Sequence, residues 1–392
     1  MRITGTYSRT TVTGEEVAAF IPHPLPPRDP PLHLDEDMLK LLRAAEDSLG
    51  RLELAGALIP SVEWFIYGFV RKEAVVSSQI EGTQATLVDL LNFEADTVDS
   101  AINADVQEVC NYLEALHFAR AELAKKKGLP LSMRLLNQTH QKLMRGVRGA
   151  GNAPGEIRKS QNWIGGTRPG NAAFVPPPPH ELPALLSAFE KYIHADEDDL
   201  PVLVRAGLLH VQFETIHPYL DGNGRIGRLL ITLLLEHWRL LSAPLLYLSL
   251  FFKRHRDEYY RRLAAVRENG DWEGWIRYFL EAASTIATET VTSARDIFSL
   301  VNRDRTKVLG AKSSSVMAAR LFEMLPEHPI ITIEKAMELL STTRPTATKA
   351  ITTLVDVKVV TEISGRKRDR VFSYSGYLDL LKTGTEIGGR GR

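Results

Sequence analysis

Two apolar stretches separated by a polar loop constrain the fold of this chain more than any other feature. Residues 200–215 carry apolar side chains at spacings of three and four, and residues 225–241 are almost continuously apolar. Each pattern predicts a buried helix. The segment HPYLDGNGRIGR, residues 217–228, lies between them and is therefore predicted to form a tight loop between two helices. The fold is expected to be mainly α.

The backbone of this loop and the arginines after it suit a phosphate-bearing ligand. Gly222 and Gly224 can adopt positive φ, so that successive N–H groups converge on one point. Arg225 is predicted to open the second helix, whose N-terminal end favours an anion. Arg225 and Arg228 are three residues apart on one helix face, and both guanidiniums can reach phosphate oxygens. We therefore predict a di- or triphosphate site.

Two further side chains of the loop can supply reactive chemistry. Asp221 is a hard oxygen ligand suited to Mg²⁺ that is shared with substrate phosphates. His217 can take a proton from an attacking hydroxyl near neutral pH. The glycines at 222, 224 and 227 also fit the dinucleotide-binding fingerprint, but that motif must follow a strand. Because a helix precedes it here, we reject that interpretation.

The whole segment resembles the signature of Fic-domain proteins, His-x-Phe-x-(Asp/Glu)-Gly-Asn-Gly-Arg-x-x-Arg. The one departure is Tyr219 in place of the commoner Phe, an aromatic ring that still fills the core position. The resemblance implies a Fic-type helical core that transfers AMP from MgATP to a Tyr, Thr or Ser hydroxyl of a target protein, with His217 as the catalytic base and Asp221 as the metal ligand. It further implies ATP contacts from residues spread along the chain: Glu81, Ile164, Gly165, Gly166, Thr167, His217, Gly222, Asn223, Gly224, Arg225, Ile226, Gly227, Arg228 and Tyr259.

A second pattern lies at the end of the helix predicted from residue 72. Ser77 and Glu81 are four residues apart and share a helix face, and Gly82 is typical of a helix C-terminus. From the residues alone, they are equally well read as solvated surface positions. Ser77-x-x-x-Glu81-Gly82 is similar to the (Ser/Thr)-x-x-x-Glu-(Gly/Asn) inhibitory motif of many Fic proteins, whose Glu pairs with the second signature Arg, here Arg228. The resemblance implies autoinhibition by Glu81, and it leaves AMP removal open.

Two β-prone pieces around residues 162–164 and 173–175 flank a Gly-rich turn and predict a hairpin. The edge strand of such a hairpin can bind a target segment by strand addition. The hairpin resembles the flap with which Fic proteins clamp the target and cover the nucleotide. A plain surface hairpin is the alternative.

Several aromatic residues and one histidine outside the loop need assignments of their own. The resemblance places Tyr259 beside the adenine and leaves Tyr260 for the core. Trp272 and Trp275, three residues apart, are predicted packing anchors of the last core helix. His210 is predicted to be a core histidine rather than a metal ligand, since no zinc-binding spacing accompanies it.

Composition excludes several classes of protein. Lysine plus arginine and aspartate plus glutamate each number 48 in 392 residues, so no overall basic field draws the chain to nucleic acid or membrane. The single cysteine, Cys110, excludes an intrachain disulfide framework and agrees with a reducing cytoplasm. No signal peptide is evident, and the apolar runs are too short to span a bilayer. We therefore expect a cytoplasmic protein.

The pattern of elements suggests four consecutive parts. They are an arm and helical region carrying the inhibitory helix (1–125), the Fic core (126–290), a connecting helix (291–312) and a C-terminal domain (313–392). The last part reads as helices over 316–325, 331–340 and 346–355, then strands over 359–363 and 371–374. This order resembles a winged helix-turn-helix domain.

The C-terminal domain leaves a second function open. Arg344, Lys349 and the wing cations Arg366, Lys367, Arg368 and Arg370 make a small basic patch. Winged helices also serve as protein-interaction modules, so the sequence does not decide between DNA and protein. The rival to adenylyl transfer is a DNA-binding regulator whose Fic core only senses nucleotide. A catalytically dead scaffold is disfavoured because every chemically required position is present, whereas self-modification and a homodimer remain open.

Overall fold

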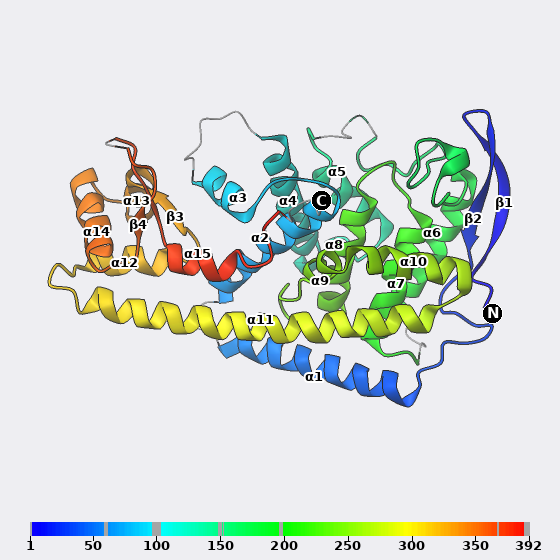
Figure 1. The fold of residues 1–392 in the computed structure, drawn as a ribbon, viewed down its shortest axis with the longest axis horizontal. Coiled ribbons are helices and arrows are strands. Elements are labelled where there is room, and N and C mark those ends of the chain that lie inside the picture. The colour runs from blue at the N-terminus through cyan, green and yellow to red at the C-terminus, as the bar shows by residue number, and fades with distance from the viewer. Residues whose placement is uncertain are drawn as a thin grey trace. The chain divides into compact units, whose positions relative to one another are not determined.

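The computed structural model describes residues 2–58, 62–95, 103–147, 151, 153–195, 199–366 and 368–387 (Figure 1). The architecture is mainly helical, as predicted. Contacts between Cα atoms divide the chain into two compact units, residues 1–50 with 111–287 and residues 51–110 with 288–392. Each unit is built from two separate stretches of chain. The consecutive four-part division predicted above differs from this grouping, which joins the predicted inhibitory helix to the C-terminal region.

The first unit begins with an antiparallel hairpin of strands β1 (Gly5–Val12) and β2 (Glu15–Pro22). Thr13 and Gly14 both adopt positive φ, which matches the two-residue turns that suit the twist of a hairpin. The Thr-rich N-terminus is therefore extended, as predicted. A proline-rich connection then leads into helix α1 (Glu36–Leu58), where the Asp35 carboxylate accepts a hydrogen bond from the N–H of Met38 at 2.9 Å.

A cluster of helices forms the core of the first unit (Figure 1). Helices α7 and α8 pack against each other, and nearly all their residues are buried. Trp275 is buried, and its indole N–H donates to the carbonyl of Gly207 at 2.9 Å, so the predicted packing role of Trp275 is confirmed. Trp272 is buried as well. The helices are α4 (Ala104–Ala124), α5 (Met133–Leu143), α6 (Leu182–Ile193), α7 (Val202–Ile216), α8 (Asn223–His237), α9 (Leu248–Arg254) and α10 (Arg256–Asn269), with 3-10 turns η1 (Pro169–Asn171) and η2 (Pro179–Glu181).

Helix α11 runs without a break from Trp272 to Leu309. The predicted connecting helix, residues 291–312, corresponds to the second half of α11, and the boundary between the two compact units at residues 287 and 288 falls inside this helix, close to the predicted boundary at 290. The physical reason is visible in the sequence, because residues 275–309 contain neither glycine nor proline to stop a helix. The core and the C-terminal region are thus joined by continuous helix.

The second unit contains the C-terminal elements. Strands β3 (Ile330–Thr332), β5 (Val371–Ser373) and β4 (Thr361–Glu362) form an antiparallel sheet in that order. The helix predicted over 331–340 is wrong at its start, since Ile331 and Thr332 belong to β3 and helix α13 begins at Ile333. The Thr332 side chain accepts from the N–H of Lys335 and so fixes that start. The remaining helices are α12 (Val316–Met324), α13 (Ile333–Leu340), α14 (Arg344–Asp356) and α15 (Ser375–Leu381).

Helices α2 (Val62–Ile80) and α3 (Leu87–Glu94) complete the second unit. Helix α2 packs against α15, and it does so at Gly68, where an added Cβ would lie 2.8 Å from a methyl carbon of Leu381. The side-chain amide of Gln79 donates to the carbonyls of Ala85 and Thr385, each at 2.9 Å. The end of α2 is therefore tied directly to the C-terminal segment.

Candidate active site

The turn that carries His217 has an unusual backbone. Helix α7 ends at Ile216, and His217 follows in the left-handed conformation with φ 50° and ψ 61°. Its N–H donates to the carbonyl of Phe213 at 2.9 Å and closes the last helical turn. A residue other than glycine held there costs about 1–3 kcal/mol, and it persists only where its surroundings enforce it. The chain thus turns sharply at the predicted base.

The loop after this turn is locked by one side chain. Asn223 accepts from the N–H of Tyr219 at 2.9 Å and donates to the carbonyl of Tyr219 at 2.8 Å. Because this pairing closes the loop early, α8 begins at Asn223 and not at Arg225 as predicted. Gly222 has φ 76°, but Gly224 lies in the first helical turn with an ordinary φ, so the predicted positive φ is confirmed only for Gly222.

The start of α8 brings together the groups predicted to meet an anion. Arg225 and Arg228 lie within the first two turns and are buried. The first N–H groups of any helix have no acceptor within it, and they add positive potential at the same end. The Asp221 carboxylate is 45% exposed, accepts from the N–H of Gly222 at 2.6 Å and lies 4.0 Å from the Arg225 guanidinium. This arrangement can hold a polyphosphate and one hard cation.

His140 packs against the loop between α7 and α8 and hydrogen-bonds to it, a role that the sequence did not reveal. Its ring stacks on Tyr219 with centroids 3.9 Å apart and planes at 4°. Its Nδ1 accepts from the N–H of Gly155 at 2.8 Å, so Nε2 carries the proton and donates to the carbonyl of Asp221 at 2.9 Å. Burial lowers the pKa of His140 to about 4, which keeps the ring neutral. No motif spacing links residue 140 to the loop, so no sequence signal could have found it.

The predicted flap is a minimal hairpin in the structure, and its role as a flap stays a prediction. Ile164 and Phe174 exchange two backbone hydrogen bonds, of 2.8 and 3.1 Å, across a turn in which Gly165 and Gly166 have positive φ. On the far side of the second flap segment, the carbonyl of Val175 accepts from the N–H of Phe20 in β2 at 2.9 Å. The second flap segment is thus hydrogen-bonded to the N-terminal hairpin at Val175, and the edge of the first segment is the one that faces away from it.

Comparison with known families agrees with this geometry. Residues 39–121 match the model of the Fic/DOC family N-terminal region, and residues 130–235 match the Fic/DOC family model. The chain carries a Fic domain. The second match spans the flap, the His217 turn and the start of α8, so the predicted family is confirmed on the residues that suggested it.

Curated relatives are named protein adenylyltransferases. The chain is 28% identical over 257 residues to the protein adenylyltransferase Fic of Culex quinquefasciatus, which covers 64% of this chain and 46% of that protein. It is 27% identical over 207 residues to a probable protein adenylyltransferase of Aquifex aeolicus, which covers 53% of this chain and 57% of that protein. The chain spans about half the length of these relatives.

Solved structures confirm the fold. A Fic family protein from Desulfovibrio desulfuricans G20 has a TM-score of 0.55 at 20% identity and covers 88% of this chain and 97% of its own. A Fic-domain signalling protein from Bacteroides thetaiotaomicron has a TM-score of 0.52 at 19% identity and covers 64% and 95%. The predicted Fic-type helical fold is therefore correct.

The tyrosine pair of α10 has the opposite burial to the one predicted. Tyr259, expected beside the adenine, is 1% exposed, and its hydroxyl lies 2.8 Å from Nε2 of His210. Tyr260, expected in the core, is 41% exposed. An adenine contact by Tyr259 stays a prediction, but in this structure it is Tyr260 that presents its ring at the surface. His210 is a core histidine, as predicted, with Nδ1 3.0 Å from the carbonyl of Gly227.

The residues of the predicted inhibitory motif lie in the second unit, whereas the Fic signature lies in the first. Ser77 is 0% exposed, so the surface alternative is wrong for this residue. Glu81 is exposed and follows directly after α2, and Gly82 has φ 100°. The pairing of Glu81 with Arg228 stays a prediction.

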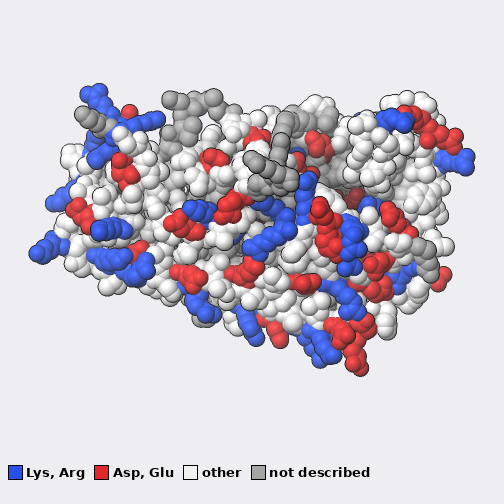
Figure 2. Space-filling view, viewed as in Figure 1, with Lys and Arg blue, Asp and Glu red and all other residues white. Residues whose placement is uncertain are grey.

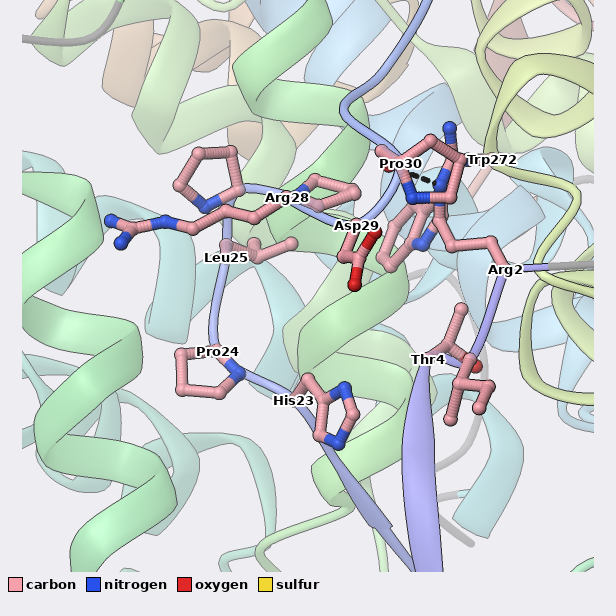
Figure 3. Close-up of a pocket in the computed structure, with 12 residues that line it drawn as sticks. Arg2, Thr4, His23, Pro24, Leu25, Arg28, Asp29, Pro30 and Trp272 are labelled. Carbon is pink, nitrogen blue, oxygen red and sulfur yellow. Dashed lines mark hydrogen bonds between the residues drawn. The ribbon is translucent and has the colours of Figure 1, made fainter.

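A cavity of about 600 Å³ lies at the base of the N-terminal hairpin, between the proline-rich arm and Trp272 (Figure 3). The Arg2 guanidinium on its wall is engaged by Glu273 at 2.8 Å and by the carbonyls of Pro30 and Pro31. No predicted site residue lines this cavity. Among the described residues, no three His, Cys, Asp or Glu side chains converge as a metal cluster, and none of the helices combines the length and apolar character needed to cross a bilayer.

Proposed function

We propose that this protein transfers AMP from ATP to a Tyr, Thr or Ser hydroxyl of a protein target. The observation that carries the proposal is the sharp turn between α7 and α8, which sets His217 only a few residues before a helix start furnished with Arg225 and Arg228. A base next to an anion-binding helix end is the arrangement that nucleotidyl transfer to a hydroxyl requires. The adenylyltransferase names of the relatives point to the same reaction.

In the proposed reaction, His217 takes the proton of the target hydroxyl, and the oxygen attacks the α-phosphorus. A new O–P bond forms as the bond to the bridging oxygen breaks, and pyrophosphate leaves. Arg225, Arg228 and the first N–H groups of α8 hold the phosphates in line and neutralise their charge. The proton then passes from His217 to solvent.

Asp221 fits Mg²⁺ that arrives with the nucleotide. Its carboxylate is partly exposed and engages the N–H of Gly222 through one oxygen, and a single carboxylate combined with substrate phosphates is a common way to hold this ion. When bound, Mg²⁺ would neutralise charge on the phosphate oxygens.

The single cysteine supports a cytoplasmic setting for the enzyme.

We also propose that Glu81 inhibits the enzyme by occupying the guanidinium of Arg228, which then cannot hold the γ-phosphate. The support is the motif Ser77-x-x-x-Glu81-Gly82 and the position of Glu81 as an exposed carboxylate just beyond α2. Water oriented by Glu81 would allow the same site to remove AMP.

Intact-mass analysis after incubation with MgATP tests both proposals, combined with labelled ATP in a host-cell extract to reveal target proteins. We expect AMP adducts with Glu81→Gly, few with the wild type and none with Glu81→Gly/His217→Ala. The matched control is Glu81→Gly/His180→Ala, which removes an exposed histidine and should behave as Glu81→Gly. Adducts in the His217 variant would refute its role as base. Absence of AMP transfer in every form, in extract as well, would refute adenylyl transfer.

DNA binding by the C-terminal region is the second candidate function. The order α12, β3, α13, α14, β4, β5 is that of a winged helix-turn-helix, and basic side chains stand out, with acidic ones among them, over these elements (Figure 2). Arg344 and Lys349 of α14 are exposed, as are Arg366 and Arg368 between β4 and β5. The predicted wing residue Lys367 lies outside the described residues. The Arg344 guanidinium also pairs with the Glu334 carboxylate at 2.8 Å, so its positive charge is partly neutralised and it would attract a DNA phosphate less strongly.

Salt-dependent binding to a duplex of random sequence tests this candidate. Arg366→Ala/Arg368→Ala should lower the slope of log affinity against log salt by about 2 if both cations contact phosphate. Lys126→Ala/Lys127→Ala removes the same charge from an exposed turn of the other unit and should leave the slope unchanged. No duplex binding, or equal slopes, would favour a protein-interaction role.

A further inference from the structure

Arg158 contacts three consecutive carbonyls at the catalytic turn. Its Nε donates to the carbonyl of His217 at 2.9 Å, and one terminal nitrogen lies 3.5 Å from the carbonyl of Ile216. Its own backbone N–H donates to the carbonyl of Pro218 at 2.9 Å. These carbonyls lie at and just after the end of α7, where the last carbonyls have no N–H donor within the helix and need donors from outside. One residue therefore supplies the donors that hold His217 in its left-handed conformation.

The same guanidinium reaches both ends of the flap. One terminal nitrogen donates to the carbonyl of Pro177, which follows the second flap segment, and the other donates to the carbonyl of Ser160 at 3.3 Å, just before the first segment. A neighbouring contact also joins the flap to the loop after His217, since the Asn162 side-chain amide donates to the carbonyl of Tyr219 at 3.2 Å. The flap and the catalytic loop thus share a set of hydrogen bonds centred on Arg158.

The surroundings of Arg158 are unusual for a buried cation. The residue is 2% exposed, and within the part of the chain that the structure describes the partners of its guanidinium are all backbone carbonyls, with no carboxylate among them. Burial without a counter-charge lowers the pKa of Arg158 to about 10. A buried charge is costly unless it is fully hydrogen-bonded, and a neutral side chain would fill this space more cheaply. What the guanidinium uniquely offers is a planar fork of donors that can reach several carbonyls at once.

We propose that Arg158 is a positioning residue that holds the flap and the His217 turn in one fixed frame. A target segment added to the free edge of the first flap segment then presents its hydroxyl to His217 at a constant distance. The step to catalysis rests on the adenylyl transfer proposed above, whereas the mechanical link between the two segments does not.

Hydrogen exchange followed by mass spectrometry tests the link without any activity. In Arg158→Lys the charge is kept, but all three ammonium donors sit on one nitrogen and cannot replace the separate Nε and terminal nitrogens that reach the two segments. We expect amides of residues 160–177 and 214–221 to exchange together, about tenfold faster or more. The control is Arg205→Lys, which alters another buried arginine of the first unit whose terminal nitrogen donates to the carbonyl of Tyr192 at 2.9 Å. That control should leave both segments protected, and unchanged exchange in Arg158→Lys would refute the link.

Kinetics in the Glu81→Gly background test the consequence. We expect Arg158→Lys to lose about 10²-fold in kcat, the scale that small misplacements of reacting groups produce, while KM for ATP stays the same. A purely structural role predicts a lower melting temperature with kcat per folded molecule retained, and that result would overturn the positioning role. If the Glu81→Gly parent itself transfers no AMP, in host-cell extract as well, the proposed reaction fails, and the exchange experiment still decides whether Arg158 joins the two segments.

Discussion

Replacing Gly222 by alanine should damage the loop between α7 and α8 through two separable effects. The residue sits at φ 76°, a conformation that costs an L-residue about 1–2 kcal/mol. An added Cβ would also lie 2.9 Å from the sulfur of Met144 and 3.3 Å from Nε2 of His140. Overpacking of this kind typically costs about 1–3 kcal/mol. We therefore expect Gly222→Ala to lower the free energy of unfolding by about 2–5 kcal/mol.

Two other glycines of the first unit separate these effects. Gly146 has φ 69° with open space around its Cβ position, so Gly146→Ala should show the backbone cost of about 1–2 kcal/mol alone. Gly50 lies inside α1 with open space and an ordinary φ, so Gly50→Ala should stabilise by about 0.5–1 kcal/mol.

Urea denaturation followed by both tryptophan fluorescence and circular dichroism measures all three variants. The two probes must give coincident curves before a single free energy is taken from them. Because Gly222 precedes the start of α8, its variant should also bind ATP more weakly than the other two. A Gly222→Ala protein no less stable than Gly146→Ala would refute the claim that the loop is packed against His140 and Met144.

Two further predictions follow, one from two buried histidines and one from the half-buried Gln79. Burial lowers the pKa of His140 to about 4 and that of His210 to about 3, from 6.5, so only the unfolded chain takes up these protons at mildly acid pH. The contribution of these neutral histidines to the free energy of unfolding should be complete above pH 6.5. It should fall by about 1.4 kcal/mol per pH unit per histidine as the pH drops toward 4. Equal free energies of unfolding from denaturation at pH 7 and pH 5 would contradict this. Gln79→Ala removes the bonds from α2 to the carbonyls of Ala85 and Thr385 and should raise AMP incorporation part of the way to that of Glu81→Gly. Incorporation equal to the wild type would mean that the C-terminal segment does not steady the inhibitory helix.

The sequence was informative wherever function depends on neighbouring residues. The turn at Gly222, the burial of Tyr219 and the helices on both sides of the loop are all as predicted, because apolar periodicity and glycine placement act over a few residues. The start of α8 was wrong by two residues because the Asn223 side chain closes the loop, a contact that propensity does not encode. The strand at Ile331 was missed because it exists only through pairing with β5.

By itself, then, the sequence indicated a Fic domain, the mainly helical fold and the position of the loop between α7 and α8. Only the tertiary structure showed that His140 and Arg158 support this loop, that β2 lies along one edge of the flap, and that α2 belongs with the C-terminal segment. The physical reason is that a sequence motif contains the side chains expected to face the ligand. The groups that hydrogen-bond the backbone of the motif come from segments that are distant in the sequence and close only in the fold. Such partners are set by packing across long sequence separations, and no local pattern announces them.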